Sequence, residues 1–265
     1  MTRQGSWASL PPEIRLQTLD SLPEGGRAQY AQVCEEWRDV IGRSIFRRLT
    51  LSQECLPRFT QLHRAGTRRL IQHVCLRIRL ATYKCPACDS PENDQTYRRN
   101  NTTVLDAIWN LFSFLGSWAM TDTTDKGITV EIDMYSPSDS KHRFRNYTFG
   151  DNDPDLSRIR TSRRHGWVNS RQISARHNTS LLRLFDYVRL RTTKEHSNLE
   201  ELPTNQVVTQ ITIRRQTRRR FTTLVIATLF QKCTRLEHIH YENWRYWNTA
   251  GQDEADEGKL HISHY

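Results

Sequence analysis

The stretch that decides how the amino-terminal part of the chain folds is residues 10–49, LPPEIRLQTLDSLPEGGRAQYAQVCEEWRDVIGRSIFRRL. Pro11 and Pro12 suit the first turn of a helix, where a missing N–H costs nothing. Glu13 adds a negative charge at the positive end of the helix dipole. The apolar side chains that follow spread over about 200° of the helix surface and form no single stripe. They are Ile14, Leu16, Leu19 and Leu22. We therefore expect this helix to pack against its own domain and also against a partner.

A second helix is predicted after the break at Pro23, Gly25 and Gly26. Between Tyr30 and Ile41 the apolar residues recur with the period of an amphipathic helix, and Gly42 is expected to end it. The short run that follows, 49–51, is expected to be a strand. Acidic and basic residues balance over 10–49, so this part of the chain is electrically neutral.

The same stretch resembles the F-box, whose family pattern opens with LPxE and an apolar residue and closes with VCxxWR and an aromatic residue. Here these elements are residues 10–14 (LPPEI), residues 33–38 (VCEEWR) and Phe46, while Thr18 replaces a usual isoleucine and Tyr30 a common leucine. The resemblance implies a three-helix domain that docks on the Skp adaptor subunit, and through it on a cullin, in Skp–cullin–F-box ubiquitin ligases. The side chains expected to bind the adaptor are Leu10, Pro11, Ile14, Leu16, Leu19, Leu22, Val33, Cys34, Trp37, Ile41 and Phe46. The alternative is that these side chains are simply the core of a small helical domain.

Downstream, strand-like and helix-like patterns alternate. Strands are predicted over 74–80, 127–135, 207–213 and 238–244, and helices over 56–63, 104–118 and 217–233, while 181–188 suits a short helix or strand. This order resembles degenerate leucine-rich repeats, although an ordinary α/β sandwich would give a similar pattern. The expected fold class is mixed α/β: a small all-helical F-box followed by an irregular leucine-rich-repeat-like strand and helix domain.

The expected domains are the F-box over 1–50, the repeat-like α/β domain over 51–247 with a polar insertion near 136–168, and a polar tail over 248–265. The second domain is similar to a group of filamentous-fungal F-box proteins with repeat-like carboxyl halves. The resemblance lies in residues 75–88 (CLRIRLATYKCPAC), 136–142 (SPSDSKH) and 238–245 (HIHYENWR). Such proteins commonly continue further, so a shortened version is expected here.

Net charge separates the two domains. The chain has 39 basic and 29 acidic residues, a formal charge of +10. Between Lys141 and Arg220 there are 18 basic and 7 acidic residues, so this stretch carries +11 and the remainder −1. The residues expected to bind an acidic or phosphorylated substrate are Arg163, Arg164, Arg214, Arg215, Arg218, Arg219 and Arg220. The alternative function is that of a basic nucleic-acid-binding protein, although the sequence contains no recognisable nucleic-acid module.

Several classes are excluded by the sequence patterns. The sequence has no apolar run of about 18 residues, which argues against a membrane span. The first residues, MTRQGSWASLPPE, lack the apolar core of a signal peptide. A cytoplasmic or nuclear location is therefore expected, with the cysteines as thiols. No catalytic motif is found, so we expect a substrate receptor without enzymatic activity and without a cofactor.

Two parts of the sequence carry residues that could bind a metal ion. Cys85 and Cys88 form half of a zinc knuckle, but a second CxxC is missing. Cys55, Cys75 or His73 could complete the set, yet their spacing matches no standard module, so free thiols in a turn and no metal are expected. His238 and His240 are expected to be the polar side of a strand.

Overall fold

The structure, a computed structural model, describes residues 7–23, 26–62, 68–118, 127–142, 162–169, 171–174, 178–188 and 199–242. The expected polar tail at 248–265 and the middle of the expected insertion at 143–161 lie outside these residues.

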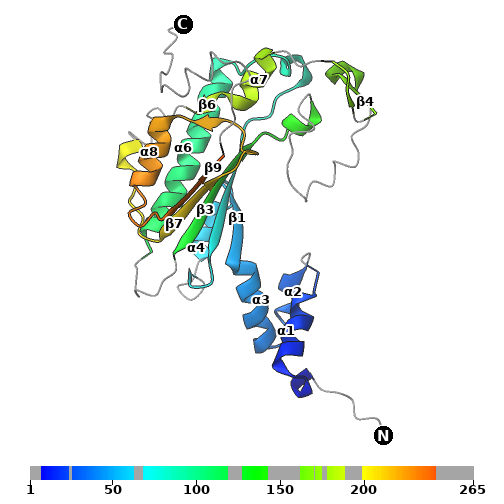
Figure 1. The fold of residues 1–265 in the computed structure, drawn as a ribbon, viewed down its shortest axis with the longest axis vertical. Coiled ribbons are helices and arrows are strands. Elements are labelled where there is room, and N and C mark those ends of the chain that lie inside the picture. The colour runs from blue at the N-terminus through cyan, green and yellow to red at the C-terminus, as the bar shows by residue number, and fades with distance from the viewer. Residues whose placement is uncertain are drawn as a thin grey trace.

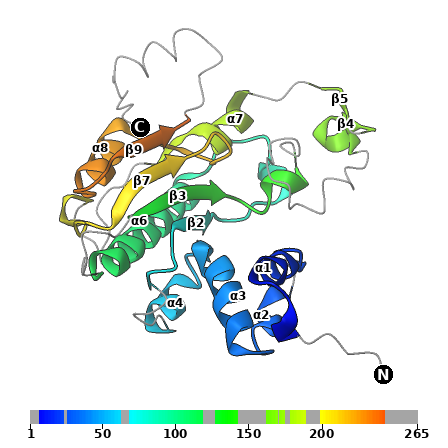
Figure 2. The ribbon, with the colours of Figure 1, turned by 60° about the horizontal axis from the view of Figure 1, so that its bottom comes forward.

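Three helices form the amino-terminal unit, which extends from one end of the sheet (Figures 1 and 2). They are α1 (Pro12–Asp20), α2 (Arg27–Tyr30) and α3 (Glu35–Arg47), preceded by the 3-10 turn η1 (Trp7–Ser9). The first helix is confirmed. The prediction of one helix from Tyr30 to Gly42 is wrong, because the chain breaks between α2 and α3 and Cys34, at the N-cap of α3, is extended. Gly42 lies inside α3 and does not end it.

The second unit is built on a five-stranded parallel sheet. Its strands are β1 (Arg48–Ser52), β2 (His73–Arg79), β3 (Ile128–Tyr135), β7 (Val208–Ile213) and β9 (His238–Tyr241). They lie side by side in the order β1-β2-β3-β7-β9, which is the order of the chain. The predicted strands are therefore confirmed, and the fold is mixed α/β. Because α3 runs directly into β1, the sheet begins at Arg48.

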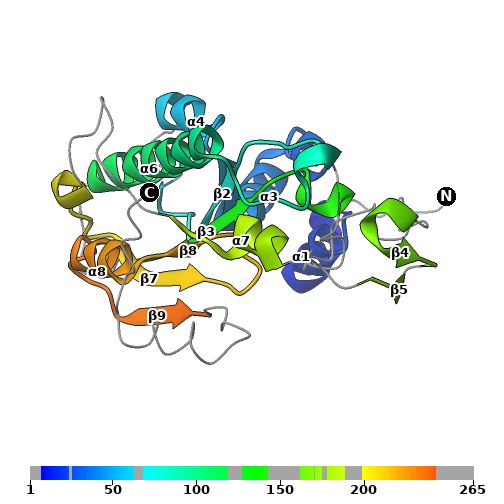
Figure 3. The same cartoon turned by 90° about the horizontal axis from the view of Figure 1, so that it is seen from above.

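Helices cover one face of this sheet (Figure 3). They are α4 (Leu56–Leu62), α6 (Asp94–Gly116) and α8 (Thr223–Gln231), and they share one apolar core with the sheet. Alternate residues of β2 and β3 point into this core, among them Leu76 and Ile132, as a strand with one packed face requires. The other face carries polar side chains. The strands are parallel and follow chain order, with helices on one face, which is a mixed α/β arrangement; whether the unit is leucine-rich-repeat-like stays a prediction.

Shorter elements lie between the strands along the chain. They are η2 (Cys85–Ala87), η3 (Asp139–Lys141), η6 (Arg163–His165), the hairpin β4 (Trp167–Val168) and β5 (Arg171–Gln172), α7 (Asn178–Phe185), β6 (Tyr187–Val188), η7 (Leu199–Glu201) and β8 (Arg220–Phe221). The segment expected as a helix or a strand is both, α7 followed by β6. The helix expected from Thr217 begins only at Thr223, because β8 first pairs with β6.

The helix α6 has 23 residues, nine of which are buried. Within the described part of the chain, no helix has the length and apolar character needed to cross a membrane.

Candidate functional site

The three-helix unit has a small core of its own. Leu19 of α1 and Ile41 of α3 are only 3% and 2% exposed. Both were expected to bind the adaptor, and the structure corrects this: their side chains fill the space between the helices and do not face a partner. For these two residues, the alternative that they form the core of a small helical domain is therefore right.

Other expected adaptor-binding residues lie on the surface. Ile14 and Leu16 on α1 are 45% and 47% exposed, and Val33, just before α3, is 61% exposed. Leu10 and Pro11, which lead into α1, are exposed as well. Large apolar side chains at this level of exposure, gathered on one small unit, mark a surface that a partner can cover.

The remaining expected residues, Leu22, Cys34, Trp37 and Phe46, are half-buried. The ring of Trp37 lies 5.0 Å from that of Trp7, centroid to centroid. Phe46, at the end of α3, packs against the core of the α/β unit, so it joins the two units.

Polar contacts that the sequence analysis missed hold the helices in place. Glu36 accepts hydrogen bonds from Trp7 Nε1 at 2.9 Å and from Arg15 Nη1 at 2.8 Å, which ties η1 and α1 to α3. Arg27 donates to the carbonyls of Asp20 and Leu22 at the end of α1 and to Ser44 Oγ of α3. Both contacts need two helices to be adjacent, and no local pattern indicates them.

The basic run at 218–220 is not a surface patch. Arg218, Arg219 and Arg220 are all buried. The guanidinium of Arg218 lies 3.8 Å from Asp139, Arg219 pairs with Glu92, and Arg220 donates to the carbonyl of Phe185 at 2.8 Å. These three residues therefore stabilise the fold, and the expectation that they bind substrate is corrected.

The other four arginines differ from one another. Arg163, Arg164 and Arg215 are exposed, and Arg163 and Arg164 lie on η6. Arg214 is half-buried, and its Nε donates to Glu131 Oε1 at 2.8 Å. Only three of these seven arginines are therefore exposed, which weakens the argument for a nucleic-acid-binding surface.

Glu131 organises the polar face of the sheet. Its carboxylate is buried and accepts from Arg214, from Arg48 Nη2 at 3.3 Å and from His73 Nε2 at 2.9 Å. Burial raises the pKa of Glu131, but the hydrogen bonds from His73 and Arg214 outweigh it and hold the pKa below its ordinary value. On the same face, burial raises the pKa of the Cys75 thiol to about 12, so it is protonated at neutral pH and is no nucleophile.

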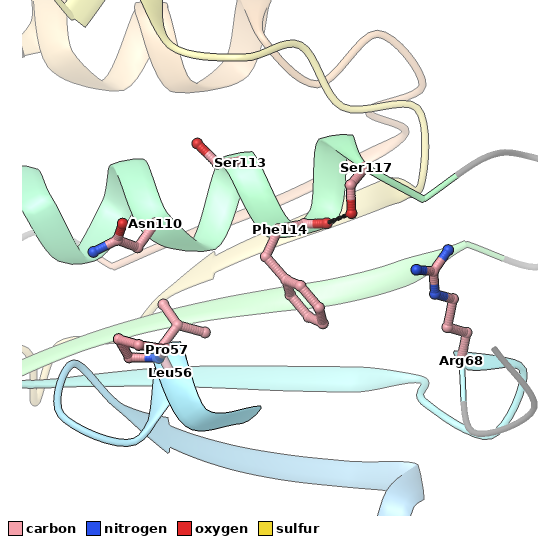
Figure 4. Close-up of a pocket in the computed structure, with 7 residues that line it drawn as sticks. All are labelled: Leu56, Pro57, Arg68, Asn110, Ser113, Phe114 and Ser117. Atoms are coloured by element: carbon pink, nitrogen blue, oxygen red, sulfur yellow. Dashed lines mark hydrogen bonds between the residues drawn. The ribbon is translucent and has the colours of Figure 1, made fainter. Parts of the chain in front are cut away.

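A groove with a volume of about 350 Å³ lies between α4 and α6 (Figure 4). Leu56, Pro57 and Phe114 form its apolar wall, and the guanidinium of Arg68 lies 5.6 Å from the ring centre of Trp118. Its seven lining residues include no carboxylate, histidine or cysteine, so the groove holds no assembled acid, base or nucleophile.

The cysteines of the CxxC motif have neighbours that the sequence analysis did not find. Cys85 and Cys88 lie beside His142 and His165, not beside Cys55, Cys75 or His73. This is the one cluster of metal-ligand type in the described ranges of the chain. The β9 histidines are not part of it: His238 and His240 are exposed, and His240 Nε2 lies 3.2 Å from Glu242.

Comparison of the sequence with models of known protein families gave no match, and comparison with curated proteins gave none either. The resemblance to the F-box therefore rests on the residues of this chain.

Proposed function

We propose that this chain is the substrate-recognition subunit of a Skp–cullin–F-box ubiquitin ligase. The observation that carries the proposal is the exposure of Leu10, Ile14, Leu16 and Val33 on a three-helix unit. These residues belong to the two ends of the F-box-like pattern, which are separate in the sequence but lie on the same small unit in the structure. Their burial would be the main driving force for binding the adaptor.

The second unit would hold the protein that is to be ubiquitinated. Its polar sheet face and the exposed Arg163, Arg164 and Arg215 suit an acidic or phosphorylated partner. The chain would act by proximity: it raises the effective concentration of the partner's lysines near the conjugating enzyme and performs no bond chemistry itself.

The proposal is tested by co-expressing the intact chain with a recombinant Skp adaptor and purifying the adaptor. We expect the wild-type chain to co-purify and Ile14→Asp to be lost, because the substitution places a charge in the apolar contact. The matched control is Leu224→Asp, since Leu224 is 69% exposed but lies on α8. It should co-purify as the wild type does.

Thermal unfolding shows whether Ile14→Asp stays folded, which we expect because the side chain is already half in solvent. The proposal is wrong if the wild-type chain does not bind the adaptor, or if Ile14→Asp binds as well as the wild type.

A further inference from the structure

The four side chains of the Cys85, Cys88, His142 and His165 cluster come from three distant segments. The cysteines lie on and just after η2, beyond the carboxyl end of β2, while His142 follows η3, beyond the carboxyl end of β3. His165 ends η6. Parallel strands place their carboxyl ends at the same edge of the sheet, so the loops after β2 and β3 are neighbours there.

The ligand atoms of these side chains are close enough for one small ion. All four lie within 4.8 Å of one another. Cys85 Sγ is 3.1 Å from His165 Nε2, and His142 Nδ1 is 3.2 Å from the same nitrogen. In a tetrahedral zinc site with two sulfur and two nitrogen ligands, the ligand atoms are about 3.3–3.8 Å apart. Adjustments of about 1 Å would therefore complete the tetrahedron.

Each histidine turns one ring nitrogen to the cluster and the other to a hydrogen-bonding group. His142 Nε2 lies 3.3 Å from the carbonyl of Tyr83, and His165 Nδ1 lies 2.8 Å from Ser162 Oγ. A carbonyl only accepts, so His142 carries its proton on Nε2 and directs the lone pair of Nδ1 at the cluster. This use of the second nitrogen is typical of histidines that bind metal ions.

The turn that carries the cysteines is held by groups outside the cluster. The buried guanidinium of Arg183 donates to the carbonyls of Ala87, Ser90 and Pro91 at 2.9–3.0 Å. The same guanidinium lies 4.4 Å from the ring centre of Tyr83, whose ring stacks on that of His142 at 5.2 Å. The positions of the cysteines and of His142 are therefore set in advance, as a specific metal site needs.

We propose that Cys85, Cys88, His142 and His165 bind a structural zinc ion. The set of two sulfurs and two nitrogens at tetrahedral spacing is the one that zinc prefers among divalent ions. On binding, each thiol releases its proton to solvent and both histidines bind as neutral rings. Two thiolates balance the charge of Zn²⁺, so the site is neutral, which suits the burial of Cys88 and His165.

The ion would join segments that are far apart in the chain. It would attach η6 and the β4–β5 hairpin to the loops after β2 and β3, at the edge of the sheet away from the three-helix unit (Figure 1). Four protein ligands leave no position open for a substrate, so the role is structural and not catalytic. The proposal is independent of the proposed function, since it involves no residue of the helical unit.

The experiment measures the zinc content of the full chain, purified without chelators and without a histidine tag, by inductively coupled plasma mass spectrometry. We expect about one zinc ion per chain for the wild type, and loss of the ion in Cys88→Ser and His165→Asn. The matched controls are Cys55→Ser and His238→Asn, whose parent side chains lie outside the cluster. Both should keep the ion.

A second measurement does not depend on the folding of any variant. The wild-type chain, stripped of metal and titrated with Co²⁺, should show the intense visible absorption of a tetrahedral site and a thiolate-to-cobalt charge-transfer band, saturating at about one ion per chain.

A metal-free alternative exists, in which His165 Nε2 donates a proton to His142 Nδ1 and Ser162 donates to His165 Nδ1. The proposal is overturned if the wild type contains no zinc and takes up no Co²⁺. It is also overturned if the Co²⁺ spectrum is octahedral, or if Cys88→Ser and His165→Asn keep a full zinc ion.

Discussion

At the scale of single residues, Glu131 has the most charged neighbourhood on the polar face of the sheet. It receives hydrogen bonds from β1, β2 and the end of β7, through Arg48, His73 and Arg214. The residue thereby links three strands by their side chains as well as by the backbone. Because its pKa is held below the ordinary value, the carboxylate stabilises the fold more when it is ionised than when it is protonated.

We predict that Glu131→Gln lowers the free energy of unfolding at pH 7 by about 1 kcal/mol, a modest figure because Arg48 and Arg214 also reach solvent. The contribution of the carboxylate is complete above the unfolded-state pKa of about 4.3 and is lost as the pH falls through the lower pKa of the folded state. The difference between wild type and variant should therefore shrink below pH 4.3 or so. Urea unfolding followed at several pH values measures it.

The control for this prediction is Glu237→Gln, since Glu237 is exposed and its loss should change stability by less than about 0.5 kcal/mol. A wild-type-minus-variant difference that stays constant from neutral to acidic pH would contradict the assigned role of Glu131.

Residue-scale predictions from the sequence succeeded where a side chain's surroundings are local. The exposed Ile14 and Leu16 follow from the spread of apolar residues around α1. The prediction that the arginines at 218–220 bind substrate was wrong. Arg218 and Arg219 pair with Asp139 and Glu92, which lie far away in the chain. A run of basic residues carries no signal that distinguishes a buried ion pair from a solvated patch.

At the scale of elements, α3 contains Gly42 at a position where neither the backbone conformation nor close packing requires a glycine. A Cβ added to Gly42 would meet no atom within 4 Å, and its backbone needs no left-handed conformation. We predict that Gly42→Ala raises the free energy of unfolding by about 0.5–1 kcal/mol, because alanine loses less backbone entropy in a helix interior. Thermal or urea unfolding of the intact chain measures this gain.

The contrasting substitution is Gly127→Ala, just before β3. Gly127 has φ of +69°, and its Cβ would meet the side chain of Thr209 on β7. This change should destabilise by about 1–2 kcal/mol or more. If Gly42→Ala also lowered the free energy of unfolding, the account of Gly42 as an unstrained residue inside α3 would be wrong, and if Gly127→Ala raised it, the account of Gly127 would be wrong.

Patterns of period two predicted the strands well, and the prolines at the first turn predicted the helix α1. The ends of α3 and α8 were predicted less well. Gly42 was expected to end a helix, but a single glycine inside a helix costs only about 1 kcal/mol, which the packing of α3 and its continuation into β1 offset. The start of α8 is set by the pairing of β8 with β6, and pairing between distant segments leaves no trace in a local pattern.

At the scale of the whole molecule, parallel pairing in chain order brings distant loops together. The histidines at 142 and 165 are 57 and 80 residues beyond Cys85, so no motif spacing links them to the CxxC pair. The CxxC pattern therefore indicates the two cysteines of the cluster, but no local pattern indicates the two histidines. A prediction of the strand order would have supplied the missing signal, because it places the loops after β2 and β3 side by side.

The two proposed sites lie at different ends of the molecule. The three-helix unit extends from the amino end of β1, and the Cys/His cluster follows the carboxyl ends of β2 and β3 (Figure 1). The excess of basic residues lies in the second unit, but some of these residues form buried ion pairs with carboxylates. This layout suits a protein that binds an adaptor at one end and leaves the rest of its surface to another partner.

The most direct test of the adaptor-binding proposal is a calorimetric titration of a purified Skp adaptor into the intact chain, with Leu16→Asp and Leu224→Asp as paired variants. We predict saturable binding with one adaptor per chain for the wild type and for Leu224→Asp, and no measurable heat of binding for Leu16→Asp at the same concentrations. Failure of the wild-type chain to bind, or equal affinities for all three proteins, would contradict the account.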